Sequence, residues 1–211
     1  PALVDAGTPV IRRTVFSYPG TDVAIDIRRQ GDAEGLYAPR RTVLDPILVD
    51  AARQAGADVR HETTLTAIVH NDDGRVGGID VIDRSGRSYT ATADIVIGAD
   101  GLHSKVARSL DVPVTRSGTA ANAVVMRYVA GSGLPSDEYR WLNQAHRIGG
   151  VIPTNDDTHC AFTSLSPVEF RAARHDVETL FWRGLHDLHS DIAAAVRGAD
   201  PAGPFRTFPG H

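Results

Sequence analysis

The strongest candidate for chemistry is a short acidic turn, Gly98-Ala99-Asp100-Gly101, near the middle of the chain. It ends the segment from Asp94 to Asp100, whose short continuous apolar core predicts a strand buried on both faces of a partly parallel sheet. Ligands of such sheets bind at the carboxyl ends of the strands. Asp100 is a short acceptor suited to ribose or ribityl hydroxyls, and glycines let a ligand approach the backbone closely. The alternative is an ordinary turn in which Asp-Gly serves geometry alone.

A second candidate is an arginine at the start of a predicted helix. The sequence Arg41-Thr42-Val43-Leu44 precedes a helical apolar pattern that ends at Gly56. We expect Asp45 to be the N-cap of this helix and Pro46 its first residue. A fixed, always-charged donor fork beside a helix N-terminus suits an anionic cofactor. The alternative is a surface arginine beside Arg40.

Both segments resemble motifs of one enzyme family. Residues 95–106 resemble the internal Asp-Gly fingerprint of the FAD-dependent, NAD(P)H-using aromatic hydroxylases, which are p-hydroxybenzoate hydroxylase-like flavoprotein monooxygenases. Arg41 with its helix resembles the Arg-x-x-Leu helix start of the same family. The fingerprint usually places an arginine three residues after its serine, where this chain has Ala107 and then Arg108. The motifs occupy about residues 39–108, and only the order of elements supports the resemblance beyond them.

The resemblance implies an FAD site and a reaction. It assigns Arg41 to the ribityl and phosphate region, the backbone of Leu65 to the adenine ring, and Asp100, Gly101 and Ser104 to the Asp-Gly contact with the flavin. NAD(P)H would be the co-substrate, and one atom of molecular oxygen would be added to a small aromatic or polyketide-like substrate. The cofactor carries the redox chemistry in such enzymes, so we assign no catalytic side chain.

Two motifs of the family are not found in the sequence. No G-x-G-x-x-G opens the chain, and the nearest run, Gly131-Ser132-Gly133, lacks the third glycine and a preceding strand. The second Gly-Asp loop is not found either, and the chain runs from Pro1 to His211. We therefore expect an internal fragment of a longer enzyme that is inactive alone and binds FAD weakly or not at all.

Two other functions stay open. A reductase, dehydrogenase or halogenase would share the Asp-Gly fingerprint, although neither Trp141 nor Trp182 fits the Trp-x-Trp-x-Ile signature of flavin halogenases. A non-catalytic ligand-binding or interaction module is the other possibility. Reading the coding sequence on either side of the chain would separate these classes.

Composition excludes several other classes. The net charge of -4, with scattered Lys and Arg, gives no attraction to nucleic acid, and no apolar run is long enough for a membrane span. The single cysteine, Cys160, allows no internal disulfide and is expected to be a buried strand thiol. His186 and His189 have no ligand set around them, so no metal is expected. We expect a cytoplasmic protein that acts on a small molecule, with an open oligomeric state.

The elements that position these residues predict an α/β (α+β) fold, in which a partial FAD-binding α/β domain is interleaved with a mainly antiparallel substrate domain. Residues 1–38 are predicted to form a substrate-side hairpin, residues 39–118 the cofactor portion with the Asp-Gly motif, and residues 119–211 the substrate sheet and helices. Four residues of the last region could line a substrate cavity or be plain core. They are Met126, Tyr128, Trp141 and Phe162.

Periodicity places the individual elements. Alternation predicts strands over 10–18, 23–28, 121–129, 147–152 and 159–165, and a meander over 65–70, 76–83 and 88–91 after a short strand at Val59. Ser166 and Glu169 form a capping-box pattern with Pro167 between them. A strong helix follows, whose apolar residues fall on one face. Those residues are Val177, Leu180, Phe181, Gly184, Leu185 and Leu188.

Overall fold

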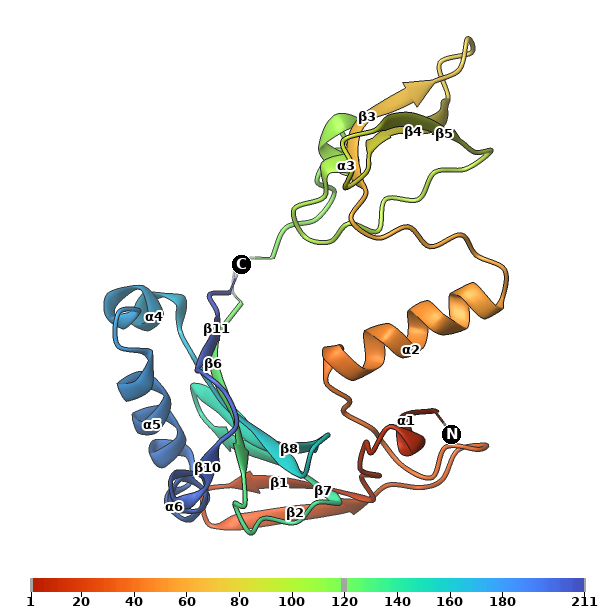
Figure 1. Cartoon of the computed structure of the whole chain (residues 1–211). Coiled ribbons are helices and arrows are strands. Elements are labelled where there is room, and N and C mark those ends of the chain that lie inside the picture. Colours follow the sequence, from red (N-terminus) through yellow and green to blue (C-terminus); the bar gives the residue numbers. More distant parts are fainter. Residues whose placement is uncertain (1, 119–120, 211) are drawn as a thin grey trace. The chain divides into compact units, whose positions relative to one another are not determined.

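The computed structural model describes residues 2–118 and 121–210. It forms two compact units, Pro1–Asp50 with Gly118–His211 and Ala51–Ser117 (Figure 1). The division between the units falls within helix α2 (Arg41–Gln54). The domain boundary expected at residue 119 and the two chain ends, Pro1 and His211, lie outside the described residues.

The first unit is a large sheet with helices. Its elements are α1 (Ala2–Asp5), β1 (Arg13–Tyr18), β2 (Thr21–Asp26), β6 (Ala123–Ala130), β7 (Glu138–Gln144), β8 (Arg147–Thr154), β9 (Thr158–Leu165), α4 (Pro167–Ala173), α5 (Val177–Leu188), α6 (Ser190–Gly198), β10 (Asp200–Pro201) and β11 (Arg206–Phe208). The strand order is β10-β6-β9-β8-β7-β1-β2, and β11 also pairs with β6. Only the β1–β7 pairing is parallel, so the sheet is mainly antiparallel, as predicted.

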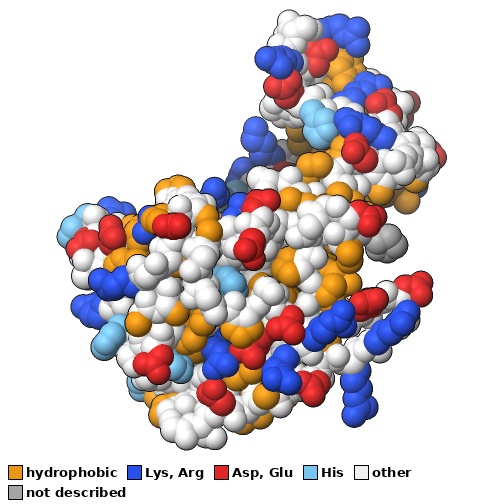
Figure 2. All heavy atoms as spheres, turned by 60° about the horizontal axis from the view of Figure 1, so that its bottom comes forward, with side chains coloured by type: hydrophobic (Ala, Val, Ile, Leu, Met, Phe, Trp, Pro, Cys, Tyr) orange, Lys and Arg blue, Asp and Glu red, His pale blue; other side chains and the backbone are white. Residues whose placement is uncertain are grey.

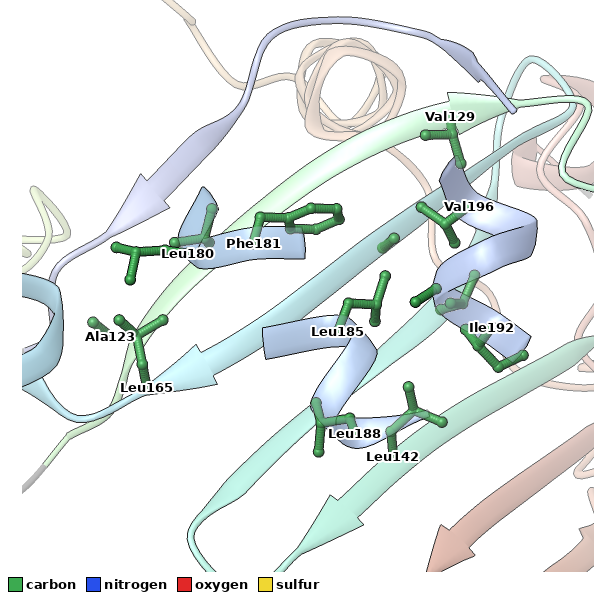
Figure 3. Close-up of a cluster of buried hydrophobic side chains, with 14 of the residues drawn as sticks. Ala123, Val129, Leu142, Leu165, Leu180, Phe181, Leu185, Leu188, Ile192 and Val196 are labelled. Carbon is green, nitrogen blue, oxygen red and sulfur yellow. The ribbon is translucent and has the colours of Figure 1, made fainter. Parts of the chain in front are cut away.

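The three helices after β9 lie on one face of this sheet (Figure 1). The apolar face predicted for α5 is confirmed, because Leu180, Phe181, Leu185 and Leu188 are all buried. Figure 3 shows these side chains against those of the strands beneath them. A Cβ at Gly184 would lie 2.6 Å from the Thr163 hydroxyl, so the missing side chain lets helix and sheet approach closely.

The predicted capping box at the start of α4 is also confirmed. The Ser166 hydroxyl accepts a hydrogen bond from the Glu169 N–H at 3.2 Å, and the Glu169 carboxylate accepts one from the Ser166 N–H at 2.9 Å. Pro167 occupies the first helical position, where its missing N–H costs no hydrogen bond. The local sequence thus fixes where this helix begins.

The second unit contains the predicted meander. Strands β3 (Thr64–His70), β4 (Val76–Ile82) and β5 (Ser88–Thr92) pair in that order and are antiparallel, and helix α3 (Lys105–Ser109) follows them. The two turns place Gly74 and Gly86 at φ of 80° and 85°, a left-handed conformation that glycine adopts without strain. The turn signals in the sequence are therefore confirmed.

Two strands predicted in this region are wrong. Residues 94–100 and Val59 lie outside any strand, and Ile95 and Ile97 are 74% and 82% exposed. An apolar run favours burial, but a strand also needs a neighbouring strand to pair with. In the part of the chain that the structure describes, the sheet of this unit consists of β3, β4 and β5 only, so the run has no ladder partner.

The predicted start of α2 is also wrong. The helix begins at Arg41, so Asp45 is not its N-cap and Pro46 lies inside it. The cause is a tertiary contact, because the side chain of Asn155 holds the N–H of Arg40 at 3.0 Å. The predicted end is confirmed, since Gly56 follows the last turn at φ of 92°.

Candidate functional site

The Asp-Gly turn is a compact set of hydrogen bonds around one carboxylate. Asp100 Oδ1 accepts from the Ser104 hydroxyl at 2.5 Å, and Oδ2 accepts from the N–H groups of Lys105 at 2.6 Å and Val106 at 3.3 Å. Ser104 is in turn the N-cap of α3 and accepts from the Ala107 N–H at 3.0 Å. The structure thus brings Asp100, Gly101 and Ser104 together in one turn.

These bonds hold Asp100 in its charged form. The Ser104 hydroxyl, and next to it the N–H groups of Lys105 and Val106, keep the pKa of this carboxyl below its usual value. An ionised carboxylate has about four acceptor positions, and three are used by these donors. Because Asp100 is also exposed, it retains acceptor capacity for a ligand hydroxyl.

The two glycines of the turn are required for different geometric reasons. Gly101 has φ of 82°, and a Cβ there would meet no atom within 4 Å, so its backbone is open to a ligand. A Cβ at Gly98 would lie 2.8 Å from two Val106 side-chain carbons, so this glycine lets the loop pack on α3. An exposed carboxylate beside open backbone fits the hydroxyl-rich part of FAD. Geometry alone also accounts for both glycines, and the cofactor role of the turn stays a prediction.

Ser104 also lines a hollow of about 430 Å³ in the second unit. Arg108, which stands one position later than the arginine of the family fingerprint, lines the same hollow. A guanidinium there is a suitable partner for an anionic group.

Leu65 lies on β3 opposite Val81 and lines a different hollow, also of about 430 Å³. At its rim the Arg60 guanidinium pairs with Asp58 at 2.5 Å and lies 5.3 Å from the centre of the Tyr89 ring. The structure therefore places Leu65 on the meander sheet and Ser104 at the Asp-Gly turn, and the two line separate hollows of one unit.

Arg41 belongs to the first unit, as the first residue of α2. Its Nε donates to Asp45 at 2.6 Å, and this hydrogen bond raises the pKa of the guanidinium. The side chain is 81% exposed, so its terminal nitrogens remain open to a ligand.

The large sheet has a second face, opposite the helices, that carries a row of half-buried side chains. In register across five strands lie Met126, Phe162, Gly150, Trp141 and Phe16. Gly150 carries no side chain, and the rings on either side of it meet edge to face at 5.6 Å. We call this side the open sheet face.

The next row of the open sheet face contains Tyr128, paired with Cys160. Burial raises the pKa of both groups, that of Cys160 to about 11. All four residues considered as substrate contacts, including Tyr128, therefore share one face. The sequence signal was the period-two alternation of β6 and β9, and Phe16 was missed because it lies far from them in the sequence.

A mainly antiparallel sheet with helices on one face, together with a smaller unit that carries a meander and an Asp-Gly turn, defines the FAD-binding flavoprotein class of fold. A family model described as "FAD binding domain" matches residues 10–208. The chain belongs to this family.

Sequence relatives include proteins with different chemistry. Digeranylgeranylglycerophospholipid reductase of Methanosarcina mazei is 32% identical over 125 residues, which cover 59% of this chain and 30% of that protein. Tetracenomycin B2 monooxygenase-dioxygenase of Streptomyces olivaceus is 35% identical over 88 residues, 41% of this chain and 16% of that protein. The chain spans about a third or less of the length of these two relatives.

Solved structures share the fold at low identity. The myxobacterial chondrochloren halogenase, an FAD-dependent enzyme, matches with a TM-score of 0.78 at 18% identity over 97% of this chain and 49% of that one. PqsL of Pseudomonas aeruginosa, a probable FAD-dependent monooxygenase, matches with a TM-score of 0.72 at 19% identity over 98% of this chain and 57% of that one. The family is thus one of FAD-dependent oxidoreductases, its sequence relatives include a reductase and a monooxygenase-dioxygenase, and a halogenase shares its fold.

The described residues show neither a metal-binding cluster nor a helix that could span a membrane. Within residues 2–118 and 121–210, no three His, Cys, Asp or Glu side chains are grouped so as to hold a metal ion. No helix of that described part is long and apolar enough to cross a bilayer.

Proposed function

We propose that the protein containing this chain is an FAD-dependent monooxygenase that uses NAD(P)H and molecular oxygen to hydroxylate a small aromatic or polyketide-like substrate. The chain supplies part of the cofactor site and the floor of the substrate site. The proposal rests on membership of the FAD-binding family and on one observation, the aromatic row of the open sheet face.

The open sheet face suits a flat apolar ligand. Phe162 and Trp141 meet edge to face, and a Cβ at Gly150 would lie 3.0 Å from the Phe162 ring, so the missing side chain lets this ring lie flat over the strand. Aromatic side chains bind flat rings through large apolar areas and preferred ring-to-ring geometries. The half-buried state of these rings means that a ligand would remove further apolar surface from water.

The cofactor roles proposed for single residues follow from their exposure and their hydrogen bonds. Arg41 offers exposed guanidinium nitrogens to a phosphate, and Asp100 offers acceptor positions to ribityl hydroxyls, with Gly101 and Ser104 shaping the turn. Leu65 is assigned to the adenine end. FAD supplies the redox chemistry, and the side chains bind, orient and keep water away.

A reductase is a second candidate, because a specific observation favours it. Seven curated relatives, which are 29% to 38% identical to parts of this chain, are named digeranylgeranylglycerophospholipid reductase. An elongated isoprenoid chain would also find apolar contact on the open sheet face. The two functions differ in product, since one adds an oxygen atom and the other adds hydrogen across a double bond.

The test uses the protein containing this chain, loaded with FAD and supplied with NAD(P)H, oxygen and a panel of aromatic and isoprenoid compounds. Product masses distinguish the two reactions. Trp141→Ala should lower kcat/KM about tenfold, because an aromatic contact of about 1.4 kcal/mol corresponds to that factor, and should leave bound FAD unchanged. Val168→Ala, on an exposed residue of α4, is the matched control. Equal kcat/KM for both variants and the wild type would contradict the open sheet face as the substrate site.

A further inference from the structure

Arg40, the residue before Arg41, makes hydrogen bonds through both its main chain and its side chain within the first unit. Arg40 immediately precedes helix α2, and its side chain reaches the turn between β8 and β9. No sequence motif marks it, because its contacts come from residues more than a hundred positions away.

The main chain of Arg40 joins the helix to the sheet. Its carbonyl accepts from the N–H groups of Val43 and Leu44, both at 2.9 Å, and its own N–H donates to Asn155 Oδ1 at 3.0 Å. Asn155 is 1% exposed, and its amide donates to the Ala6 carbonyl at 3.0 Å. The first turn of α2 is therefore attached to a side chain that cannot itself move freely.

The guanidinium of Arg40 contacts the same turn between β8 and β9. Nη2 donates to Thr158 Oγ1 at 2.7 Å, and Nη1 lies 3.3 Å from Asp156 Oδ2. The plane of the fork lies over the ring of Tyr128, with Cζ 4.5 Å from its centroid. Thr158 donates in turn to the Asn155 carbonyl at 2.8 Å, so the main-chain and side-chain contacts of Arg40 converge.

This arrangement has a cost in free energy. Arg40 Nε is buried without a hydrogen-bond partner, the one such side-chain nitrogen or oxygen found in the described residues. Asp156 and Asp157 have φ of 62° and 50°, the left-handed conformation of a tight hairpin turn, which aspartate adopts more readily than most residues. A buried donor left without a partner costs free energy, so the other contacts of the Arg40 side chain must hold it in place.

We propose that Arg40 is a positioning residue for the cofactor site. It locks the first turn of α2 onto the β8–β9 turn and so fixes the direction in which Arg41 presents its guanidinium. This inference rests on the proposed function, in which Arg41 binds FAD. Because Arg40 also lies on Tyr128, it connects the open sheet face to the cofactor arginine through a single residue.

A lysine at position 40 would keep the positive charge but lose the planar guanidinium group. It has no planar fork to contact Thr158 and Asp156 together, and it stacks less well on Tyr128. Arg40→Lys therefore removes the lock while retaining a long cationic side chain. Arg13→Lys is the matched control, since Arg13 makes an exposed ion pair with Asp26 far from α2 in the sequence.

The first measurement needs no cofactor. Hydrogen exchange in the 211-residue chain reports the N–H groups of Val43 and Leu44, which Arg40 holds through its carbonyl. Arg40→Lys should accelerate their exchange about tenfold or more relative to the wild type, and Arg13→Lys should not. Unchanged exchange in Arg40→Lys would overturn the proposal whatever the fate of FAD.

The second measurement uses FAD and the protein containing this chain. Arg40→Lys should raise the Kd for FAD about tenfold, and the same change in an Arg41→Gln background should raise it no further, because Arg40 acts through Arg41. Additive losses would overturn the positioning role and indicate general destabilisation. Failure of the wild type to bind FAD would contradict the proposed function, which the exchange measurement does not require.

Discussion

The two units differ sharply in how their apolar side chains are used. Among the described residues, Val81 is the one buried apolar side chain of the second unit, and the rest of the buried core belongs to the first. The second unit instead exposes a series of large apolar side chains. They are Ile95, Ile97, Leu102, Leu110, Val112 and Val114.

Stability and binding chemistry therefore lie in different parts of this chain. The first unit gains its stability from helices on a sheet, and its open sheet face offers a surface on rigid strands. The second unit carries the Asp-Gly turn on a loop held mainly by hydrogen bonds of its own residues. Loops of this kind have fewer packing contacts and open more easily than a packed core.

Charge does not separate the two units. In the view of Figure 2, Lys and Arg side chains are interspersed with Asp and Glu, and hydrophobic side chains lie between them. Such a mixed surface provides no broad field for a polyanionic partner. The two units therefore differ in the packing of their apolar side chains rather than in charge.

The largest effect is expected from truncation of the first unit's core. Leu185 is a fully buried residue of α5, and Leu185→Ala should lower the free energy of unfolding by about 2–5 kcal/mol through lost burial and a cavity. The matched change in the second unit is Leu102→Ala, which removes a side chain that is 68% exposed and should cost less than about 0.5 kcal/mol. Urea unfolding measures both. Similar losses would mean that the second unit is packed as tightly as the first.

A smaller effect is expected from overfilling the same interface. A Cβ in Gly184→Ala would meet Arg147 Nη1 and Thr163 Oγ1, both at 2.6 Å, and should destabilise by about 1–3 kcal/mol. Gly198→Ala is the control, because a Cβ there meets no atom within 4 Å. Thermal unfolding of the pair isolates the close approach of helix to sheet. A neutral Gly184→Ala would show that the interface can relax at little cost.

The elements predicted correctly from the sequence are those specified by neighbouring residues. The apolar face of α5 and the capping box at Ser166 depend on spacings of three and four positions, and both are confirmed. The meander turns depend on single glycines such as Gly74. Local patterns of this kind carry their own physical cause.

The elements that were missed depend on distant partners. Strand β7 mixes charged and apolar residues, and the charges are tolerated because Arg140 pairs with Glu138 at 2.7 Å and with Asp22 at 2.8 Å. The early start of α2 depends on Asn155, and the lock at Arg40 depends on Thr158. For the candidate site, the sequence indicated the residues of the Asp-Gly turn but not that Asp100 also caps α3.

The smallest effect expected is a titration shift within the second unit. Ser104→Ala removes the strongest of the bonds that lower the pKa of Asp100, so this pKa should rise toward its ordinary value. Carboxyl NMR shifts followed against pH would measure it. Thr63→Ala, whose hydroxyl donates to the His61 carbonyl instead, is the control and should leave the titration of Asp100 unchanged.

The sign of the stability effect follows from the depressed pKa of Asp100. A carboxyl whose pKa is lower in the folded state contributes stability above its unfolded value of 3.8, and this is lost as pH falls through the folded value. Ser104→Ala should therefore weaken the acid dependence of the second unit and leave the core of the first unaffected. An unchanged Asp100 titration would mean that the N–H groups of α3 alone hold the carboxylate, and that the turn is organised by the helix rather than by Ser104.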